Sequence, residues 1–349
     1  MGFDALLPLA GLLGAAVVFT GWLSVLRTVF TPRRTSTAAA RWSVRVVAAT
    51  VFTIARRAPR GLRERVLDTC MPLSVFLMLW SWLVLQVVGF VLVAIAIGVV
   101  GARPDEVVRF LTLHDDQAAG AGLGLLVWVS CAMVLAVFMV HLLRLMDSFR
   151  RRELLVTGGM ITAVVPSDAE VLLVEHLRTG SRERLDGAFA QWSAWLADIR
   201  ATHVSYPSLL YYRPASQFEW LRAAVVVLDA AALVQAIAPH WAPPHTKALL
   251  HNGTHCLEES ASRLGLRVPR TEVSLHGREE HAFSDAIGAA LAAGLPPERT
   301  GEDAWHAFQS ARTRYAPHVS MISAHLMYDF ELPASPDPAA DERTRTPVA

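Results

Sequence analysis

Three long stretches without a charged side chain lie in the first 145 positions of the chain and dominate its hydrophobic pattern. They run from Ala5 to Leu26, from Pro72 to about Gly101 and from Gln117 to Leu143. Because about 20 consecutive apolar residues in a helix cross the hydrocarbon layer of a bilayer, the pattern predicts three transmembrane helices. A cleaved signal peptide is the alternative for the first stretch, but the segment before it holds Asp4 and no basic residue, which fits poorly.

After Arg150 the apolar residues recur at intervals of three and four, as they do on one face of a helix. Capping-box sequences at Ser167–Glu170 and Ser216–Glu219 predict two helix starts. The stretch 223–238 is almost wholly apolar but holds Asp229, so we expect a buried core helix and not a fourth span. Further helices are predicted from about 181 to 203, and over about 244–264, 279–293 and 302–328. No stretch alternates as a strand does.

These patterns predict an all-α membrane protein with three transmembrane helices and a cytoplasmic all-helical domain. The expected parts are a first transmembrane helix (1–30), an arginine-rich cytoplasmic loop with an interfacial helix (31–71), a two-helix unit with a short outer loop (72–146), the cytoplasmic helical domain (147–332) and a disordered tail (333–349), rich in Pro, Ala and acidic residues.

Loop charges predict the orientation of the spans. Ten arginines lie between the first and second stretches against Glu64 and Asp68, whereas the loop between the second and third stretches is mainly acidic. Because arginine-rich loops stay in the cytoplasm, we expect a multi-pass protein of a cell inner (plasma) membrane with its N-terminus outside. The strong preference for arginine over lysine, with abundant alanine, indicates a GC-rich bacterial genome.

The arginine-rich loop contains an amphipathic segment from Trp42 to Arg57. Its apolar residues Val44, Val47, Val51 and Ile54 recur at helical spacing, and arginines lie near both ends. We predict a helix that lies on the anionic inner leaflet of the bilayer. A cytoplasmic extension of the first span is an equal alternative.

Composition excludes several classes of function. Hydrophobic residues make up 53% of the chain and charged residues 18%, and mean hydropathy is +0.36, which excludes a fully soluble enzyme. A formal charge of +1 argues against a nucleic-acid partner. Cys70, Cys131 and Cys256 are too far apart for a zinc site or a disulfide framework. No catalytic or nucleotide-binding motif is present, so neither an enzymatic activity nor a cofactor is expected.

Five short motifs follow one another along the chain. They are Ala121-Gly122-Leu123-Gly124-Leu125-Leu126, Ser148-Phe149-Arg150-Arg151-Arg152-Glu153, the segment His203 to Arg213, Leu228-Asp229-Ala230-Ala231-Ala232-Leu233 and Arg314-Tyr315-Ala316-Pro317-His318. Together they resemble a bacterial two-transmembrane potassium-channel-like family with an extra N-terminal helix. The resemblance implies a two-helix pore unit with a re-entrant loop, a cytoplasmic helical domain and a homo-oligomer.

The chain departs from this family at the selectivity filter. A potassium filter needs a glycine-rich run, because glycine lets successive carbonyls point at the ion and replace its water. Here the corresponding place reads Phe110-Leu111-Thr112-Leu113-His114-Asp115-Asp116, without a glycine. We therefore expect no selective potassium conduction by the usual means.

Candidate pathway residues lie in and after the short loop. In a symmetric homo-oligomer Thr112, Asp115 and Asp116 would form the outer mouth, where a ring of carboxylates concentrates monovalent cations; a solvated loop is the alternative. His141, near the inner end of the third span, is a candidate gate or an interfacial histidine. The candidate pore-lining residues are Val127, Cys131, Leu135, Phe138 and His141.

Two further sites lie in the second half. Asp229 in its apolar helix must be hydrogen-bonded or paired if it is buried, and we expect a structural role sooner than a catalytic one. His251 and His255 have the spacing of two metal ligands on a helix, but this signal alone is weak, and no metal site is predicted.

Two hypotheses follow for the function. The first is an integral membrane, channel-like protein without a recognisable potassium filter that could form a poorly selective ion pathway. The alternative is a non-conducting, membrane-anchored regulatory or scaffold protein whose cytoplasmic helical domain binds a partner or ligand.

Overall fold

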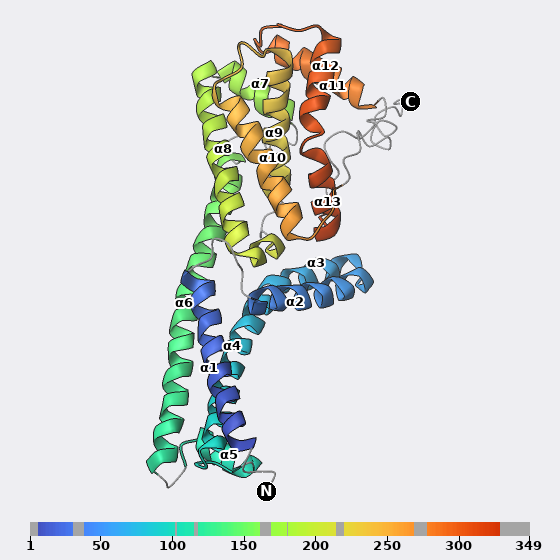
Figure 1. Ribbon diagram of the computed structural model, residues 1–349. Helices are drawn as coiled ribbons and strands as arrows, with labels where there is room; N and C mark the ends of the chain where they lie inside the picture. Colours follow the sequence, from blue (N-terminus) through green and yellow to red (C-terminus); the bar gives the residue numbers. More distant parts are fainter. Residues whose placement is uncertain are drawn as a thin grey trace. The chain divides into compact units, whose positions relative to one another are not determined.

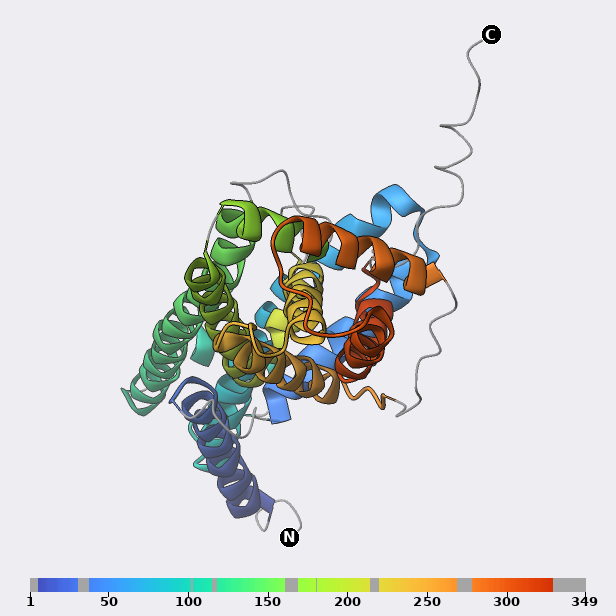
Figure 2. The ribbon, with the colours of Figure 1, turned by 90° about the horizontal axis from the view of Figure 1, so that it is seen from above.

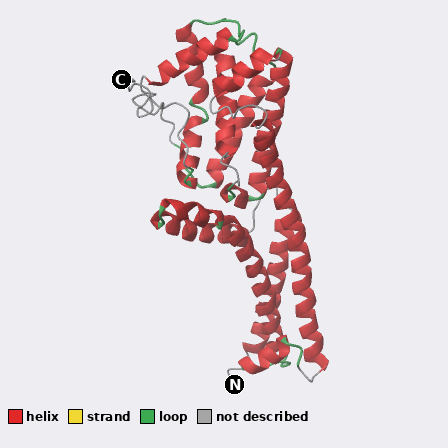
Figure 3. Ribbon diagram, turned by 180° about the vertical axis from the view of Figure 1, so that it is seen from behind, coloured by secondary structure: helices red, strands yellow, loops and turns green. Residues whose placement is uncertain are grey.

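The computed structural model describes residues 6–30, 38–101, 103–114, 118–160, 169–179, 181–213, 220–268 and 278–328. Within these ranges the regular structure is entirely helical, without a strand (Figure 3). The chain divides into two compact units, unit 1 with residues 1–148 and 205–213, and unit 2 with residues 149–204 and 214–349. Four helical stretches of the described residues are long and apolar enough to cross a membrane: Leu7–Phe30, Gly61–Ala96, Ala119–Val156 and Trp220–Ile237.

Unit 1 is built around two apolar helices, α1 and α4, which lie side by side (Figure 1). Two shorter helices, α2 and α3, run crosswise to this pair in the same figure. The helices of unit 1 are α1 (Leu6–Phe30), α2 (Ala38–Arg57), α3 (Arg60–Asp68), α4 (Cys70–Ala96), α5 (Pro104–Leu111), the first part of α6 (Ala118–Met160) and the 3₁₀ helix η1 (Pro207–Tyr211).

Glycines allow α1 and α4 to pack backbone against backbone. A Cβ atom added to Gly14 would lie 2.6 Å from the carbonyl oxygen of Gly89, and one added to Gly89 would lie 2.9 Å from that of Gly14. Helices in a membrane associate through such close contact of small residues, because lipid offers no hydrophobic drive between them. The two glycines therefore fix the closest approach of α1 and α4.

The second apolar stretch ends earlier than its hydropathy predicts. Helix α4 stops at Ala96, five residues before Gly101. Gly98 has a left-handed backbone (φ 74°), and the amide of Val99 donates to the carbonyl of Ala94 at 3.0 Å. This is a glycine-terminated helix end, which a hydrophobicity pattern alone does not locate.

Unit 2 is a helical domain with the apolar helix α9 at its centre. Figure 2 shows α9 surrounded by other helices of this unit, and α7, α10, α12 and α13 all contact it. Of its residues, 89% are buried, as expected for a core helix. The helices of unit 2 besides the end of α6 are α7 (Ala169–Thr179), α8 (Arg182–Ser205), α9 (Trp220–Ile237), α10 (His245–Arg263), α11 (Arg278–Ala292), α12 (Gly301–Arg312) and α13 (Ala316–Leu326).

The predicted single helix over 302–328 is wrong, because the chain forms α12 and α13 with a break at 313–315. Pro317 lies in the first turn of α13, where its missing N–H costs nothing. In the interior of a longer helix its ring would clash with the preceding turn. The capping-box residues Ser167 and Ser216 and the tail 333–349 lie outside the described residues.

Two acidic side chains hold the turn between α9 and α10. The carboxylate of Glu298 accepts hydrogen bonds from the amides of His240 (2.6 Å) and Trp241 (2.8 Å). Asp186 accepts one from the amide of His245 at 2.8 Å, at the start of α10. A carboxylate at a helix N-terminus satisfies a free N–H and opposes the helix dipole, so these contacts fix the turn that orients α9 in the core.

Candidate functional site

The short helix α5 lies between α4 and α6 in the chain, in the segment where the candidate mouth residues were predicted. It begins with Pro104 at the first helical position and has Asp105 and Glu106 in its first turn, all of which favour a helix start. Arg109 pairs with Asp105 one turn away, at 3.2 Å. Phe110 is buried in an apolar cluster with Ala94, Val100 and Val127, which holds the helix against α4 and α6.

The carbonyls at the end of α5 are used within the chain. The amides of Thr112 and Leu113 donate to the carbonyls of Val108 (2.9 Å) and Phe110 (3.2 Å), and the amide of His114 donates to that of Arg109 (2.9 Å). Leu113 adopts a left-handed backbone (φ 56°), a conformation that costs a non-glycine residue roughly 1–2 kcal/mol. The chain thus closes the helix end although it lacks the usual glycine.

Two contacts from the rest of unit 1 complete this arrangement. Trp128 of α6 donates its indole N–H to the carbonyl of Leu111 at 2.9 Å. Gly124, one turn earlier, allows the backbone of α5 to come close, since an added Cβ would lie 3.0 Å from the carbonyl oxygen of Phe110. Nδ1 of His114 lies 2.8 Å from the carbonyl oxygen of Thr112. Every carbonyl from 108 to 112 therefore has a donor inside the chain.

Of the predicted mouth residues, the structure describes only Thr112. It is exposed, and its hydroxyl donates to the carbonyl of Val108 at 2.8 Å. Asp115 and Asp116 lie outside the described residues. Thr112 thus belongs to the closed end of α5, with its hydroxyl directed at its own helix.

The five predicted pore-lining residues do not share one open face of α6. Val127, Phe138 and His141 are buried within a single chain, and Cys131 is half-buried against the same cluster as Val127. Leu135, one turn from both Cys131 and Phe138, is 44% exposed. The exposed side of α6 is formed instead by apolar residues, among them Leu125, Leu126, Val129, Met133, Leu135, Met139, Val140 and Leu143.

A polar network joins α1, α4 and α6 at mid-span. The indole N–H of Trp22 donates to the hydroxyl of Ser130 (3.1 Å), which donates to Oε1 of Gln86 (3.2 Å). Trp82 of α4 donates to the hydroxyl of Ser24 at 3.2 Å. Such hydrogen bonds link membrane helices with a net strength of about 0.6 kcal/mol each. The position of Gln86 within an apolar stretch predicts a hydrogen bond to a neighbouring helix, which the structure confirms. The partners themselves are not predicted, because they are far apart in the chain.

The predicted gate residue His141 lies in an aromatic environment within unit 1. Its ring is 5.4 Å from that of Tyr206 and 6.5 Å from that of Phe138. One turn further, Arg144 donates to the carbonyl of Val29 near the end of α1, at 3.1 Å. His141 is therefore packed inside the single chain.

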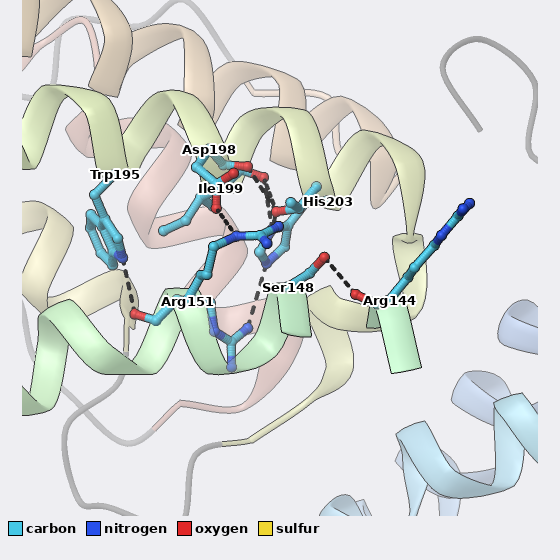
Figure 4. Close-up of polar contacts among 9 residues, drawn as sticks. Arg144, Ser148, Arg151, Trp195, Asp198, Ile199 and His203 are labelled. Atoms are coloured by element: carbon cyan, nitrogen blue, oxygen red, sulfur yellow. Dashed lines mark hydrogen bonds and ion pairs between the residues drawn. The ribbon is translucent and has the colours of Figure 1, made fainter. Parts of the chain in front are cut away.

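Unit 2 contains a buried arginine cluster near the end of α6, which sequence reasoning missed (Figure 4). Arg152 is buried, pairs with Glu153 (2.9 Å) and reaches Nε2 of His203 (3.5 Å). Trp195 donates its indole N–H to the carbonyl of Arg152 (3.0 Å), and Arg151 pairs with Asp198 (3.4 Å). The only sequence signals were the Arg-Arg-Arg-Glu motif and the helical spacing of Trp195 and His203.

His203 is neutral at physiological pH. Burial, and then the charge of Arg152, lower its pKa from 6.5 to about 3. Its Nδ1 donates to the carbonyl of Ile199 at 2.8 Å, which leaves Nε2 as an acceptor toward Arg152. The neutral imidazole of His203 thus serves as a hydrogen-bonding group beside the paired Arg152.

Asp229 lies in the core of unit 2 with two partners. The hydroxyl of Tyr315 donates to its carboxylate, and Nε of Arg312 lies 3.5 Å from it. Burial, and then the negative charge of Asp229, raise the pKa of Tyr315 well above its usual value. A hydrogen-bonded, charge-paired carboxylate in a filled core has the features of a structural group.

His251 and His255 lie next to each other on the exposed side of α10. Their ring centroids are 4.4 Å apart, and His255 pairs with Glu258 at 3.3 Å. Among the described residues no group of three or more His, Cys, Asp and Glu side chains could hold a metal ion. The glycine between the histidines has a packing role, because a Cβ at Gly253 would lie 2.4 Å from the buried side chain of Leu228.

No family model, curated protein or solved structure matches the chain, so its resemblance to a channel-like family stays a prediction from the motifs.

Proposed function

We propose that this chain is an integral membrane protein of channel-like layout that conducts no potassium selectively and acts as a membrane-anchored regulatory or scaffold protein. Helices α1, α4 and α6 cross the bilayer in this proposal. Unit 2 is the cytoplasmic helical domain that meets a partner or ligand.

The burial pattern supports three spans. The best windows of α1, α4 and α6 are 17%, 28% and 28% buried within the chain, so each leaves a broad apolar surface for lipid. The window of α9 is 89% buried, and helices with charged outer faces surround it. A helix that is covered by its own domain needs no lipid, so α9 serves as the core of unit 2.

The hydrogen bonding of α5 carries the proposal that the protein is non-conducting. A filter works by presenting free backbone carbonyls to a dehydrated cation. In this chain the carbonyls from Val108 to Thr112 are used by amides, by His114 and by Trp128. To point together at one ion these carbonyls would have to leave the helical arrangement, and each hydrogen bond lost in that change costs about 0.5–1.5 kcal/mol.

A flux assay in proteoliposomes tests this directly. We expect vesicles that contain the full chain to hold potassium and sodium gradients as well as protein-free vesicles, at all imposed voltages. The W128F variant should stay equally tight, because loss of one donor does not create a ring of carbonyls. Currents strongly selective for potassium over sodium would contradict the proposal.

A poorly selective ion pathway between copies is the second candidate. It is favoured by the exposure of Thr112, Leu113 and His114 at the end of α5, directly before Asp115 and Asp116 in the sequence. This candidate predicts a leak of both ions that is abolished in the D115N/D116N variant. The same assay therefore separates the two functions.

A further inference from the structure

The apolar face of α2 that the sequence assigns to lipid is covered in part within unit 1. Val47, Val51 and the neighbouring Ala55 are buried and Val44 is half-buried, whereas Ile54 is 52% exposed. Helix α2 packs on α4 and η1, and the ring of Phe52 meets that of Tyr211 at 5.9 Å. The centre of this apolar stripe is therefore used for internal packing, which leaves Ile54 and the opposite face of α2 open.

The opposite face of α2 is open and combines apolar with basic side chains. Trp42 is 55% exposed and Val46 is 38% exposed. At 100° per residue, Arg45 and Arg56 lie on one side of these two residues and Arg57 on the other, and all three arginines are exposed. We call these five residues the α2 outer face.

The charge of this region is strongly one-sided. The sequence from 38 to 68 holds seven arginines against Glu64 and Asp68. Within the described residues no ion pair joins Arg45, Arg56 or Arg57 to an acidic side chain. Their charges are therefore available to a partner that carries the opposite charge.

The position of α2 indicates what that partner is. Helix α1 ends at Phe30 and α4 begins at Cys70, and α2 and α3, which lie between them in the chain, run crosswise to both (Figure 1). If α1 and α4 cross the bilayer, the chain leaves the bilayer at the end of α1 and re-enters it at the start of α4. A crosswise helix at this level lies in the plane of the lipid headgroups.

We propose that the α2 outer face binds the headgroups of anionic phospholipids in the bilayer that α1 and α4 cross; this inference rests on the spans of the proposed function. The indole of Trp42 has the apolar body and polar edge that favour the membrane interface. The guanidinium groups of Arg45, Arg56 and Arg57 match phosphate oxygens in geometry and charge.

The test measures lipid preference at Trp42 in the full chain. The protein is reconstituted in phosphatidylcholine vesicles with either brominated phosphatidylglycerol or brominated phosphatidylcholine, and quenching of tryptophan emission is recorded. Subtraction of the W42F variant isolates Trp42. We expect phosphatidylglycerol to quench Trp42 more strongly, and added salt to reduce the difference.

Matched charge variants identify the residues responsible. Each arginine near an anionic surface contributes about a fivefold preference, so R45Q/R56Q/R57Q should remove most of the preference. R178Q/R267Q/R314Q removes the same charge from exposed positions of unit 2 and should leave it unchanged. Equal quenching by both lipids in the wild type, or an unchanged preference in R45Q/R56Q/R57Q, would overturn the inference. Release of the protein from vesicles by alkaline washing would instead refute the spans.

Discussion

At the scale of single residues, the sequence predicts that Asp229 is buried but does not identify its hydrogen-bond donor. Its apolar neighbours predict burial, and burial predicts a partner. The donor, Tyr315, is 86 residues away along the chain, however, so no local pattern identifies it. The same holds for Trp128, which lies 17 residues beyond the carbonyl that it contacts.

The Tyr315→Phe substitution tests the role of this pair. It removes the hydroxyl that donates to Asp229 and keeps the ring that fills the core. A buried carboxylate that loses a donor destabilises the folded state by about 1–3 kcal/mol. We expect a lower Tm for the full chain in detergent, measured by circular dichroism, and D229N should lower it further, because it removes the carboxylate that pairs with the buried Arg312. An unchanged Tm in Tyr315→Phe would show that the hydroxyl is dispensable.

His203 makes the stability of unit 2 sensitive to acid. Its pKa is about 3 in the folded chain, against 6.5 as the ordinary value. Below about pH 6.5 the unfolded chain therefore binds a proton that the folded chain does not bind. The contribution of neutral His203 to the free energy of unfolding is complete above about pH 6.5. It falls by roughly 1.4 kcal/mol per pH unit as the pH decreases toward about 3.

The measurement for His203 is Tm as a function of pH. The wild type should lose stability steadily below about pH 6.5. The H203Q variant should be less stable at neutral pH, because the contacts with Ile199 and Arg152 change, but its Tm should fall less steeply in acid. Parallel curves for the two proteins would assign the acid sensitivity to other groups.

At the scale of helices, periodicity and hydropathy locate most elements, and helix ends are the main errors. The apolar runs place α1, α4 and α6 because lipid and core alike demand apolar side chains. The break between α12 and α13 was missed because apolar residues continue through it, whereas Pro317 decides the start of α13. Helix α6 continues to Met160, beyond its apolar run, because its polar end is held by unit 2 contacts such as that of Trp195 with Arg152.

Glycine positions in the apolar helices predict which contacts tolerate a methyl group. Gly14→Ala places a Cβ 2.6 Å from the backbone of Gly89, so α1 and α4 must separate. Gly122→Ala in α6 meets no atom within 4 Å, and alanine favours a helix by roughly 1 kcal/mol over glycine. We expect Gly14→Ala to lower the Tm in detergent by several degrees and Gly122→Ala to leave it equal or higher. An unchanged Tm in the Gly14→Ala variant would mean that α1 and α4 do not pack as closely as described.

At the scale of the whole molecule, composition indicates a membrane protein but leaves the number of spans ambiguous. Helix α9 matches a span in length and hydropathy, and only its burial among α7, α10, α12 and α13 distinguishes it. The function is harder still to read. The absence of filter glycines is visible in the sequence, but the closure of α5 depends on contacts with Trp128 and Gly124 of another helix.

A topology with three spans places both ends of α9 on one side of the membrane, whereas a topology with four spans places them on opposite sides. If α9 is a core helix, epitopes inserted after Arg213 and after Gly265 lie on the same side of the membrane, and if it spans they lie on opposite sides. The basic loop before α4 predicts the cytoplasmic side for both. In intact cells of an expression host we expect neither epitope to be labelled, and both to be labelled after permeabilisation. An epitope at the N-terminus, predicted to lie outside, should be labelled in intact cells and serves as the control. Labelling of the Gly265 epitope alone in intact cells would make α9 a fourth span, and unit 2 could then not be a single cytoplasmic domain.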